Sequence, residues 1–221
     1  MRVVEDLGLN GLKIVQDDGL YKFTSDAILL SRFATVKNGD VVADYCAGSG
    51  VVGLHLYGLN PALISSVTFF ELQKPMCDLS LQTIKLNGLE DKFSAVNVAL
   101  QDLPKECYGK FSLIVCNPPY TTVQSGMVAP NDLLAVCRSE VKLNLPELVR
   151  AVRLGLKFGG RVCMCHRADR LADVMCEFRA NGIEPKRLQI VSSIGKEPYL
   201  VLIEGVKGGK SGLKILNPIS N

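Results

Sequence analysis

The sequence predicts an α/β domain built on a mostly parallel β-sheet. Short apolar runs that read as buried strands alternate with segments of helical spacing from about residue 40 onward. The runs at 40–46, 66–72, 92–100 and 111–117 are mostly apolar, which indicates strands covered on both faces. Alternation of this kind is typical of parallel strands joined by right-handed helical crossovers.

The C-terminal half continues the alternation and then changes it. Residues 144–160 have helical spacing and end at Gly159-Gly160, and residues 161–166 read as the next strand. After a helix over 168–182, two strands at 187–193 and 199–206 follow one another with only a turn between them. We therefore expect an antiparallel hairpin to close the sheet.

Length and composition favour one domain. The chain has 221 residues and is 48% hydrophobic, which suffices for one well-covered core. We expect an N-terminal extension with a covering helix over 1–40, a catalytic core over 41–206, and a basic, glycine-rich, loosely held tail over 207–221.

Several classes of protein are not favoured. Glu5 and Asp6 follow Met1 closely, and no apolar segment resembles a signal peptide or the roughly 18 consecutive apolar residues of a membrane span. The eight cysteines form no CxxC pair and mostly lie in apolar runs, and there are only two histidines. We expect reduced core thiols, no metal, no membrane contact and a cytoplasmic protein.

Charge is distributed unevenly along the chain. Residues 1–137 carry 10 Lys and Arg against 14 Asp and Glu, whereas residues 138–221 carry 15 against 8. A basic C-terminal half is consistent either with a polyanion such as RNA bound there or with an ordinary solvated surface.

A glycine-rich loop follows the first strand of the sheet. Gly48, Gly50 and Gly53 lie between that strand and a helix, where a loop needs backbone freedom and close approach to a ligand. No Gly-Lys-Ser/Thr follows, so the loop is not a Walker loop. The spacing also fits a nicotinamide dinucleotide site.

Two acids help to identify the ligand of this loop. Asp44, at the end of the first strand, would repel a pyrophosphate but suits a cationic ligand, and Glu71 ends the next strand, where a carboxylate can bind both hydroxyls of a ribose. The pair favours S-adenosylmethionine over NAD, although both acids could also be solvated strand ends.

The fourth strand stops at Asn117-Pro118-Pro119-Tyr120. Proline has no N–H and a fixed φ, so the carbonyl here is held rigidly. The Asn117 side-chain oxygen and the Pro118 carbonyl can accept both protons of one exocyclic amine and direct its lone pair at an electrophile. Tyr120 offers a face for a planar base, a stacking contact worth about 1–3 kcal/mol. No strong general base is needed, because the methyl group is already activated and aligning the amine with it accounts for most of the catalysis.

The order "DYCAGSG", Glu71 and "NPPY" resembles the class I S-adenosylmethionine-dependent methyltransferases that act on planar amino groups. The resemblance implies a Rossmann-like, seven-stranded mixed sheet of order 3-2-1-4-5-7-6 with helices on both faces. It also implies a set of cofactor-binding residues: Asp44, Ala47, Gly48, Ser49, Gly50, Glu71, Leu72, Leu100 and Asn117. Asn117, Pro118 and Tyr120 would be catalytic, and Pro119 and Tyr120 would contact the target base.

Further segments are similar to the bacterial tRNA1(Val) adenine N6-methyltransferases, which modify the adenine beside the anticodon. These segments are "KFTSDAILLSRFA", "CRSE", "CHRADRL" and "GGKSGLKIL". The likeness implies that Thr24 and Asp26 close over the cofactor, and that Arg138, Arg167 and Arg170 contact RNA phosphates or bases.

Two positions depart from the family pattern. Ala99 stands where relatives usually carry an acid that contacts the cofactor's adenine, and Cys46 replaces the usual glycine or small residue in the first loop. The NPPY motif indicates methyl transfer to an amino group more specifically than it indicates the substrate. The alternatives are a glutamine N5-methyltransferase acting on a protein, an rRNA amino-group methyltransferase, and a non-catalytic RNA-binding protein on the same scaffold.

Overall fold

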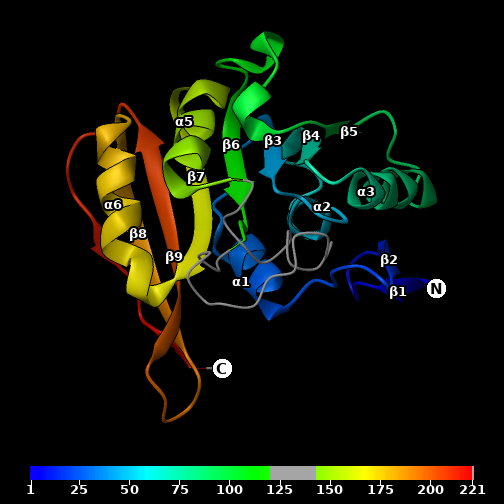
Figure 1. The fold of residues 1–221 in the computed structure, drawn as a ribbon, viewed down its shortest axis with the longest axis horizontal. Coiled ribbons are helices and arrows are strands. Elements are labelled where there is room, and N and C mark those ends of the chain that lie inside the picture. Colours follow the sequence, from blue (N-terminus) through cyan, green and yellow to red (C-terminus); the bar gives the residue numbers. More distant parts are fainter. Residues whose placement is uncertain (120–142, 221) are drawn as a thin grey trace.

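A twisted mixed sheet forms the centre of the computed structural model, which describes residues 1–119 and 143–220 (Figure 1). Its seven long strands are ordered β5-β4-β3-β6-β7-β9-β8, and β9 runs antiparallel to both neighbours. Numbered along the chain, this is the predicted order 3-2-1-4-5-7-6. The strands are β3 (Asp40–Tyr45), β4 (Ile64–Glu71), β5 (Phe93–Asn97), β6 (Phe111–Cys116), β7 (Leu156–Arg167), β8 (Ile183–Ser192) and β9 (Pro198–Lys207).

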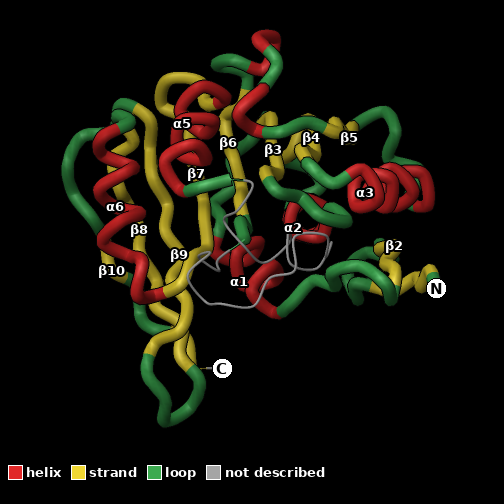
Figure 2. The backbone as a smooth tube through the Cα atoms, in the orientation of Figure 1, coloured by secondary structure: helices red, strands yellow, loops and turns green. Residues whose placement is uncertain are grey.

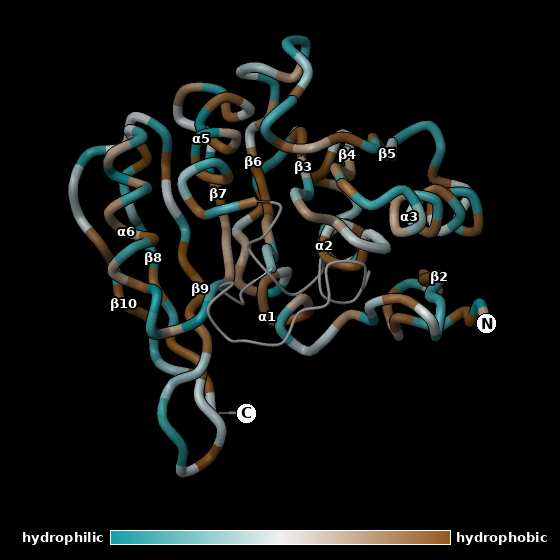
Figure 3. The backbone as a smooth tube through the Cα atoms, in the orientation of Figure 1, coloured by the Kyte–Doolittle hydropathy of each residue, from teal (hydrophilic) through white to brown (hydrophobic). Residues whose placement is uncertain are grey.

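Helices cover both faces of the sheet, as predicted, and each face has its own core (Figure 2). α1 (Ser25–Phe33), α2 (Val51–Leu59) and α3 (Lys74–Leu86) contribute to one core. α5 (Leu145–Gly155) and α6 (Leu171–Ala180) contribute to the other. Hydrophobic residues dominate α2, which follows β3 in the chain, and β6, which pairs with β3 in the sheet (Figure 3). Short 3-10 helices span Leu100–Asp102, Lys105–Cys107 and Ala168–Arg170.

The helix predicted over 144–160 is shorter than expected. A capping box between Asn144 and Glu147 begins α5, and α5 ends at Gly155. Leu156 already pairs with Phe111 of β6, so β7 includes the residues expected to be helical. The pairing of Leu156 with β6 sets this boundary. The helical spacing of the sequence carries no information about that pairing.

The C-terminal tail is not loosely held. β10 (Lys214–Ile215) and β11 (Ile219–Ser220) pair in parallel with β8, so the main sheet has nine strands within the described residues. The N–H of Leu216 donates to the carbonyl of Leu188 at 2.8 Å, and the side chain of Leu216 packs against the core. The expectation failed because two-residue strands carry almost no periodic signal.

An N-terminal β-hairpin was not predicted. β1 (Arg2–Asp6) and β2 (Lys13–Asp17) pair antiparallel, and β2 lies against α3. Thr83 Oγ1 accepts the N–H of Val15 at 3.0 Å, and the Asn87 amide bonds both backbone groups of Lys13 at 2.9 and 2.7 Å. These contacts fix the start of the segment that leads from β2 to α1. The division into 1–40, 41–206 and 207–221 stays a prediction.

Candidate functional site

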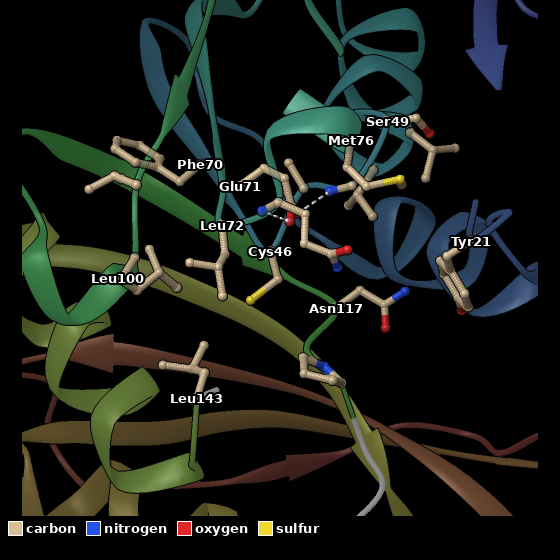
Figure 4. Close-up of a pocket in the computed structure, with 18 of the residues that line it drawn as sticks. Tyr21, Cys46, Ser49, Phe70, Glu71, Leu72, Met76, Leu100, Asn117 and Leu143 are labelled. Carbon is tan, nitrogen blue, oxygen red and sulfur yellow. Dashed lines mark hydrogen bonds between the residues drawn. The ribbon is translucent and has the colours of Figure 1, made fainter. Parts of the chain in front are cut away.

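A pocket lies where the carboxyl ends of β3, β4 and β6 meet, next to the first loop of the sheet (Figure 4). These strands are parallel neighbours, so the residues that follow them are brought together. The lining comprises Tyr21, Phe23, Cys46, Ala47, Gly48, Ser49, Val51, Val52, Phe70, Glu71, Leu72, Gln73, Met76, Val98, Ala99, Leu100, Gln101, Asn117, Pro119 and Leu143.

Packing within the protein explains Gly50, the N-cap of α2, and Gly53, which lies inside α2 and not in the loop where the sequence analysis placed it. Gly50 has φ +90°, and a Cβ there would lie 2.6 Å from the Phe69 ring. A Cβ on Gly53 would lie 2.7 Å from the same ring. Of the three glycines, Gly48 lines the pocket, together with Ala47 and Ser49, whereas Gly50 and Gly53 do not. Phe69 therefore accounts for Gly50 and Gly53 without a ligand.

Glu71 connects β4 to the first loop. Its Oε2 accepts the N–H of Gly48 and its Oε1 accepts the N–H of Gln73, each at 2.8 Å (Figure 4). The side chain is buried but lines the pocket. Burial raises the pKa of Glu71, although the hydrogen bonds from Gln73 and Gly48 favour the charged form. A buried carboxylate thus forms one wall of the pocket.

Asp44 lies beneath the pocket and does not line it. The side chain is fully buried, and its Oδ2 accepts the N–H of Gly53 at 2.8 Å. Its Oδ1 has no hydrogen-bond partner within the described residues. Burial raises the pKa of Asp44 to about 7, and the charge of Glu71 contributes in the same direction. Asp44 therefore supports the first turn of α2, and its ionised form adds negative potential below the pocket.

The Asn-Pro-Pro segment begins where β6 ends. Asn117 and Pro119 line the pocket, and Pro118 is buried between them. Figure 4 shows the Asn117 amide on the side of the pocket where Tyr21 lies. The Asn117 Oδ1 lies 3.0 Å from the Cys165 Sγ of β7, within hydrogen-bonding distance. The structure thus brings Asn117 to the same pocket as Gly48 and Glu71. Tyr120 and Arg138 lie outside the described residues.

The rest of the wall is apolar, with polar groups at intervals. Leu72, Val98, Leu100 and Met76 surround the space beside Glu71. Gln101 lines the pocket close to Ala99, where relatives carry an acid, and its Nε2 donates to Glu147 at 3.1 Å. Such a wall suits a planar ring more than an extended charged chain.

Two aromatic residues at the pocket were missed by the sequence analysis. Tyr21 and Phe23 line it from the segment between β2 and α1, whereas the predicted Thr24 and Asp26 are not among the lining residues. Thr24 is the N-cap of α1, and Asp26 lies in its first turn, where burial raises the pKa of the Asp26 carboxyl. The proximity of Tyr21 and Phe23 to Thr24 in the chain was the available signal.

Arg167 and Arg170 are not among the residues that line the pocket. Arg167 ends β7 and binds Asp169 through two nitrogens, at 3.0 and 2.5 Å. Arg170 Nε contacts Asp173 Oδ2 at 2.5 Å. Both are therefore held by neighbouring acids at the carboxyl end of β7.

Within residues 1–119 and 143–220, no cluster of three or more His, Cys, Asp and Glu side chains is arranged to hold a metal ion. None of the helices described is both long enough and apolar enough to span a bilayer.

Comparison with known families decides the class. The model of the methyltransferase small domain family matches residues 23–141, more than half of the chain. The chain belongs to this family. It is a class I S-adenosyl-L-methionine-dependent methyltransferase, as the sequence predicted. The pocket fits this cofactor, since it offers a buried carboxylate, the small residues Ala47, Gly48 and Ser49 of the first loop, and apolar walls.

Relatives share about a quarter of their residues with this chain. A protein of Parabacteroides distasonis named tRNA1(Val) (adenine(37)-N6)-methyltransferase is 22% identical, over 80% of this chain and 73% of its own length. A protein of the same name in Shewanella putrefaciens is 28% identical, over 81% of this chain and 74% of its own length.

Solved structures share the fold. A predicted O-methyltransferase from Agrobacterium tumefaciens superposes with a TM-score of 0.68 at 16% identity, covering 88% of this chain and 86% of that one. The Pyrococcus horikoshii protein TYW2, solved in complex with MeSAdo, superposes with a TM-score of 0.65 at 17% identity, covering 94% and 72%. These likenesses place the sheet and helices among Rossmann-like methyltransferases.

Proposed function

We propose that the enzyme transfers a methyl group to the exocyclic N6 amine of an adenine in RNA, and that this adenine is the one beside the anticodon of tRNA1(Val). The observation that carries the proposal is that Asn117 lines the same pocket as Gly48 and Glu71. An amide that can hold an amine thus lies beside the proposed cofactor site. The names of the relatives in Parabacteroides distasonis and Shewanella putrefaciens support adenine in a tRNA as the target.

Bound S-adenosyl-L-methionine would supply a methyl group on a positively charged sulfur. In our proposal, Glu71 binds the ribose hydroxyls, and Gly48, with its neighbours Ala47 and Ser49, lies against the methionine end. Leu72 and Leu100 enclose the adenine. Asp44, buried below the loop, would favour a cationic ligand when its carboxyl is ionised, and a cation bound nearby would favour that ionised form. Gln101 supplies a polar group near Ala99 in place of the acid found in relatives.

Asn117 and Pro118 would act on the target amine. The amine of adenine is a weak nucleophile because its lone pair is delocalised into the ring. When the Asn117 Oδ1 and the Pro118 carbonyl accept its two protons, the lone pair is directed out of the ring plane. The new C–N bond forms as the methyl leaves sulfur, and the amine then loses one proton to solvent. Tyr120, which follows Pro119 in the sequence, is proposed to stack on the base.

Charge supports a nucleic-acid substrate over a protein one. Residues 138–221 carry 15 Lys and Arg against 8 Asp and Glu. Arg167 and Arg170 lie at the carboxyl end of β7, the strand beside β6, from which Asn117 follows. Phosphates that displace Asp169 and Asp173 from these arginines would anchor the RNA near the pocket.

The test is methylation of unmodified tRNA. Purified protein is incubated with S-adenosyl-L-methionine labelled in its methyl group and total tRNA from cells that lack this modification, and the labelled nucleoside is identified and mapped. We expect label in N6-methyladenosine at the adenine beside the anticodon of tRNA1(Val). Parallel incubations contain unmodified rRNA or protein in place of tRNA. Label in rRNA alone, or in protein glutamine alone, would redirect the assignment to that substrate, and no transfer to any of the three would contradict it.

A further inference from the structure

A thiol contacts the amide proposed to hold the target amine. Cys165 Sγ of β7 lies 3.0 Å from Asn117 Oδ1 and 3.9 Å from the carbonyl oxygen of Cys116. The contact follows from strand register. Cys116, the last residue of β6, pairs with Met164 of β7, so the residues that follow these two, Asn117 and Cys165, are also neighbours.

The thiol is held firmly in place. Cys165 is fully buried and belongs to the core on the α1–α3 face of the sheet. Its strand lies between β6 and β9, so the backbone cannot shift without disturbing two ladders. A group fixed in this way can fix the orientation of a side chain that it contacts.

Orientation matters for an asparagine because its amide is nearly symmetric in shape. Rotation by a half turn about the last side-chain bond exchanges the oxygen and the NH₂ group. In one orientation Oδ1 accepts protons from the target amine, whereas in the other an NH₂ group faces that amine and repels it. The amide oxygen has two lone pairs, so it can accept from Cys165 and still accept from the substrate.

We propose that Cys165 is a positioning residue whose S–H group selects the productive orientation of the Asn117 amide. The inference rests on the proposed function, in which Asn117 Oδ1 accepts a proton of the target amine. The thiol forms no bond to substrate or cofactor, and nothing is transferred to or from it.

The chain offers a matched control two residues earlier. Cys163 lies on the same strand and the same face and is also fully buried. Its Sγ contacts Glu204 Oε2 of β9 at 3.6 Å instead of Asn117. Replacing Cys163 by Ala therefore removes the same atoms from the same core without touching the amide.

The experiment compares Cys165→Ala, Cys165→Ser and Cys163→Ala in steady-state methylation and in cofactor binding. We expect Cys165→Ala to lower kcat by about 10-fold, because a misaligned group slows transfer more than it weakens binding, with KM and the cofactor Kd within about 2-fold of wild type. Cys165→Ser keeps a donor and should restore most of the rate, and Cys163→Ala should behave as wild type. Equal losses in Cys163→Ala and Cys165→Ala, or no loss in Cys165→Ala, would overturn the inference.

A second readout needs neither turnover nor the alanine variant at Cys165. The infrared S–H stretch of Cys165, isolated as the difference between wild type and Cys165→Ser, should shift when Asn117 is replaced by Ala, because the acceptor is lost. An unshifted band overturns the inference. Loss of turnover in Asn117→Ala alongside full turnover in Cys165→Ala would contradict only the role of Cys165. Full turnover in Asn117→Ala would contradict the proposed function as well.

Discussion

The carboxylate of Glu71 and the backbone N–H of Gly48 form a hydrogen bond of 2.8 Å that connects the end of β4 to the loop after β3. Two adjacent parallel strands are thereby joined at the pocket. The same carboxylate is bonded to Gln73, so both of its oxygens are held in a fixed direction. Glu71 thus shapes the loop and also presents negative charge to the pocket.

Replacing Glu71 by Gln should weaken cofactor binding by about 10-fold or more. The variant loses the charge-assisted acceptor, and its NH₂ group faces a backbone N–H that needs an acceptor. Isothermal titration with S-adenosyl-L-methionine measures the effect. Glu90→Gln, an exposed acid between α3 and β5, serves as control and should leave Kd unchanged. Equal Kd values for the two variants would show that Glu71 does not contribute to the cofactor site.

Replacing Gly50 by Ala should destabilise the fold more than the same replacement at Gly88, a glycine of similar backbone conformation. Gly50 has φ +90° and a Cβ there meets the Phe69 ring at 2.6 Å, whereas Gly88 has φ +62° and open space around it. Gly88→Ala should lose about 1–2 kcal/mol of unfolding free energy from strain alone. Gly50→Ala should lose a further 1–3 kcal/mol, roughly, from overpacking. Urea unfolding of both variants measures the difference, and equal losses would mean that Phe69 moves aside freely.

Asp44 should make the stability of the protein depend on pH. Its pKa is raised from 3.8 to about 7 in the folded chain, so the folded state binds more protons than the unfolded state between these values. Unfolding free energy should therefore fall as pH rises from about 4 to about 7, by up to roughly 4 kcal/mol from this group. Asp44→Asn, which keeps an acceptor for Gly53, should remove this part of the decline. The check is urea unfolding of both proteins across this pH range, and parallel curves would contradict the assignment.

RNA binding should weaken with salt, and Arg167 should contribute to that dependence. Each phosphate contact that is lost reduces the slope of log K against log salt by about 1. We expect that reduction for Arg167→Ala between about 50 and about 200 mM salt. Arg179, in the last turn of α6 and paired with Glu184, provides the control. A slope unchanged by Arg167→Ala, or reduced equally by Arg179→Ala, would show that Arg167 does not contact the RNA.

The seven long strands followed from the sequence because each has a strong local signal, whereas their order followed from the resemblance to the methyltransferase family. The run 111–117 is apolar and then ends at prolines, and the strands at 187–193 and 199–206 have only a turn between them. Asn117 and Glu71 could be placed at one edge because parallel strands end on the same side.

Other features depend on contacts that a local pattern does not contain. Thr83 and Asn87, at the end of α3, bond β2 and so hold the β1–β2 hairpin in place. They lie about 70 residues from β2 in the chain. β10 and β11 exist because β8 offers an edge to pair with. Tyr21 and Phe23 reach the pocket from the segment that follows β2, and their proximity in the chain to the predicted Thr24 was the one local signal for them.

The central claim is that Asn117 holds the target amine and contributes little to the affinity for the cofactor. The most direct measurement is single-turnover methyl transfer by Asn117→Ala beside its cofactor Kd, with Asn181→Ala, a helix C-cap on α6, as the matched control. We predict that Asn117→Ala slows transfer by about 100-fold or more while its Kd stays within about 3-fold of wild type, and that Asn181→Ala does neither. Transfer by Asn117→Ala at the wild-type rate would contradict the account.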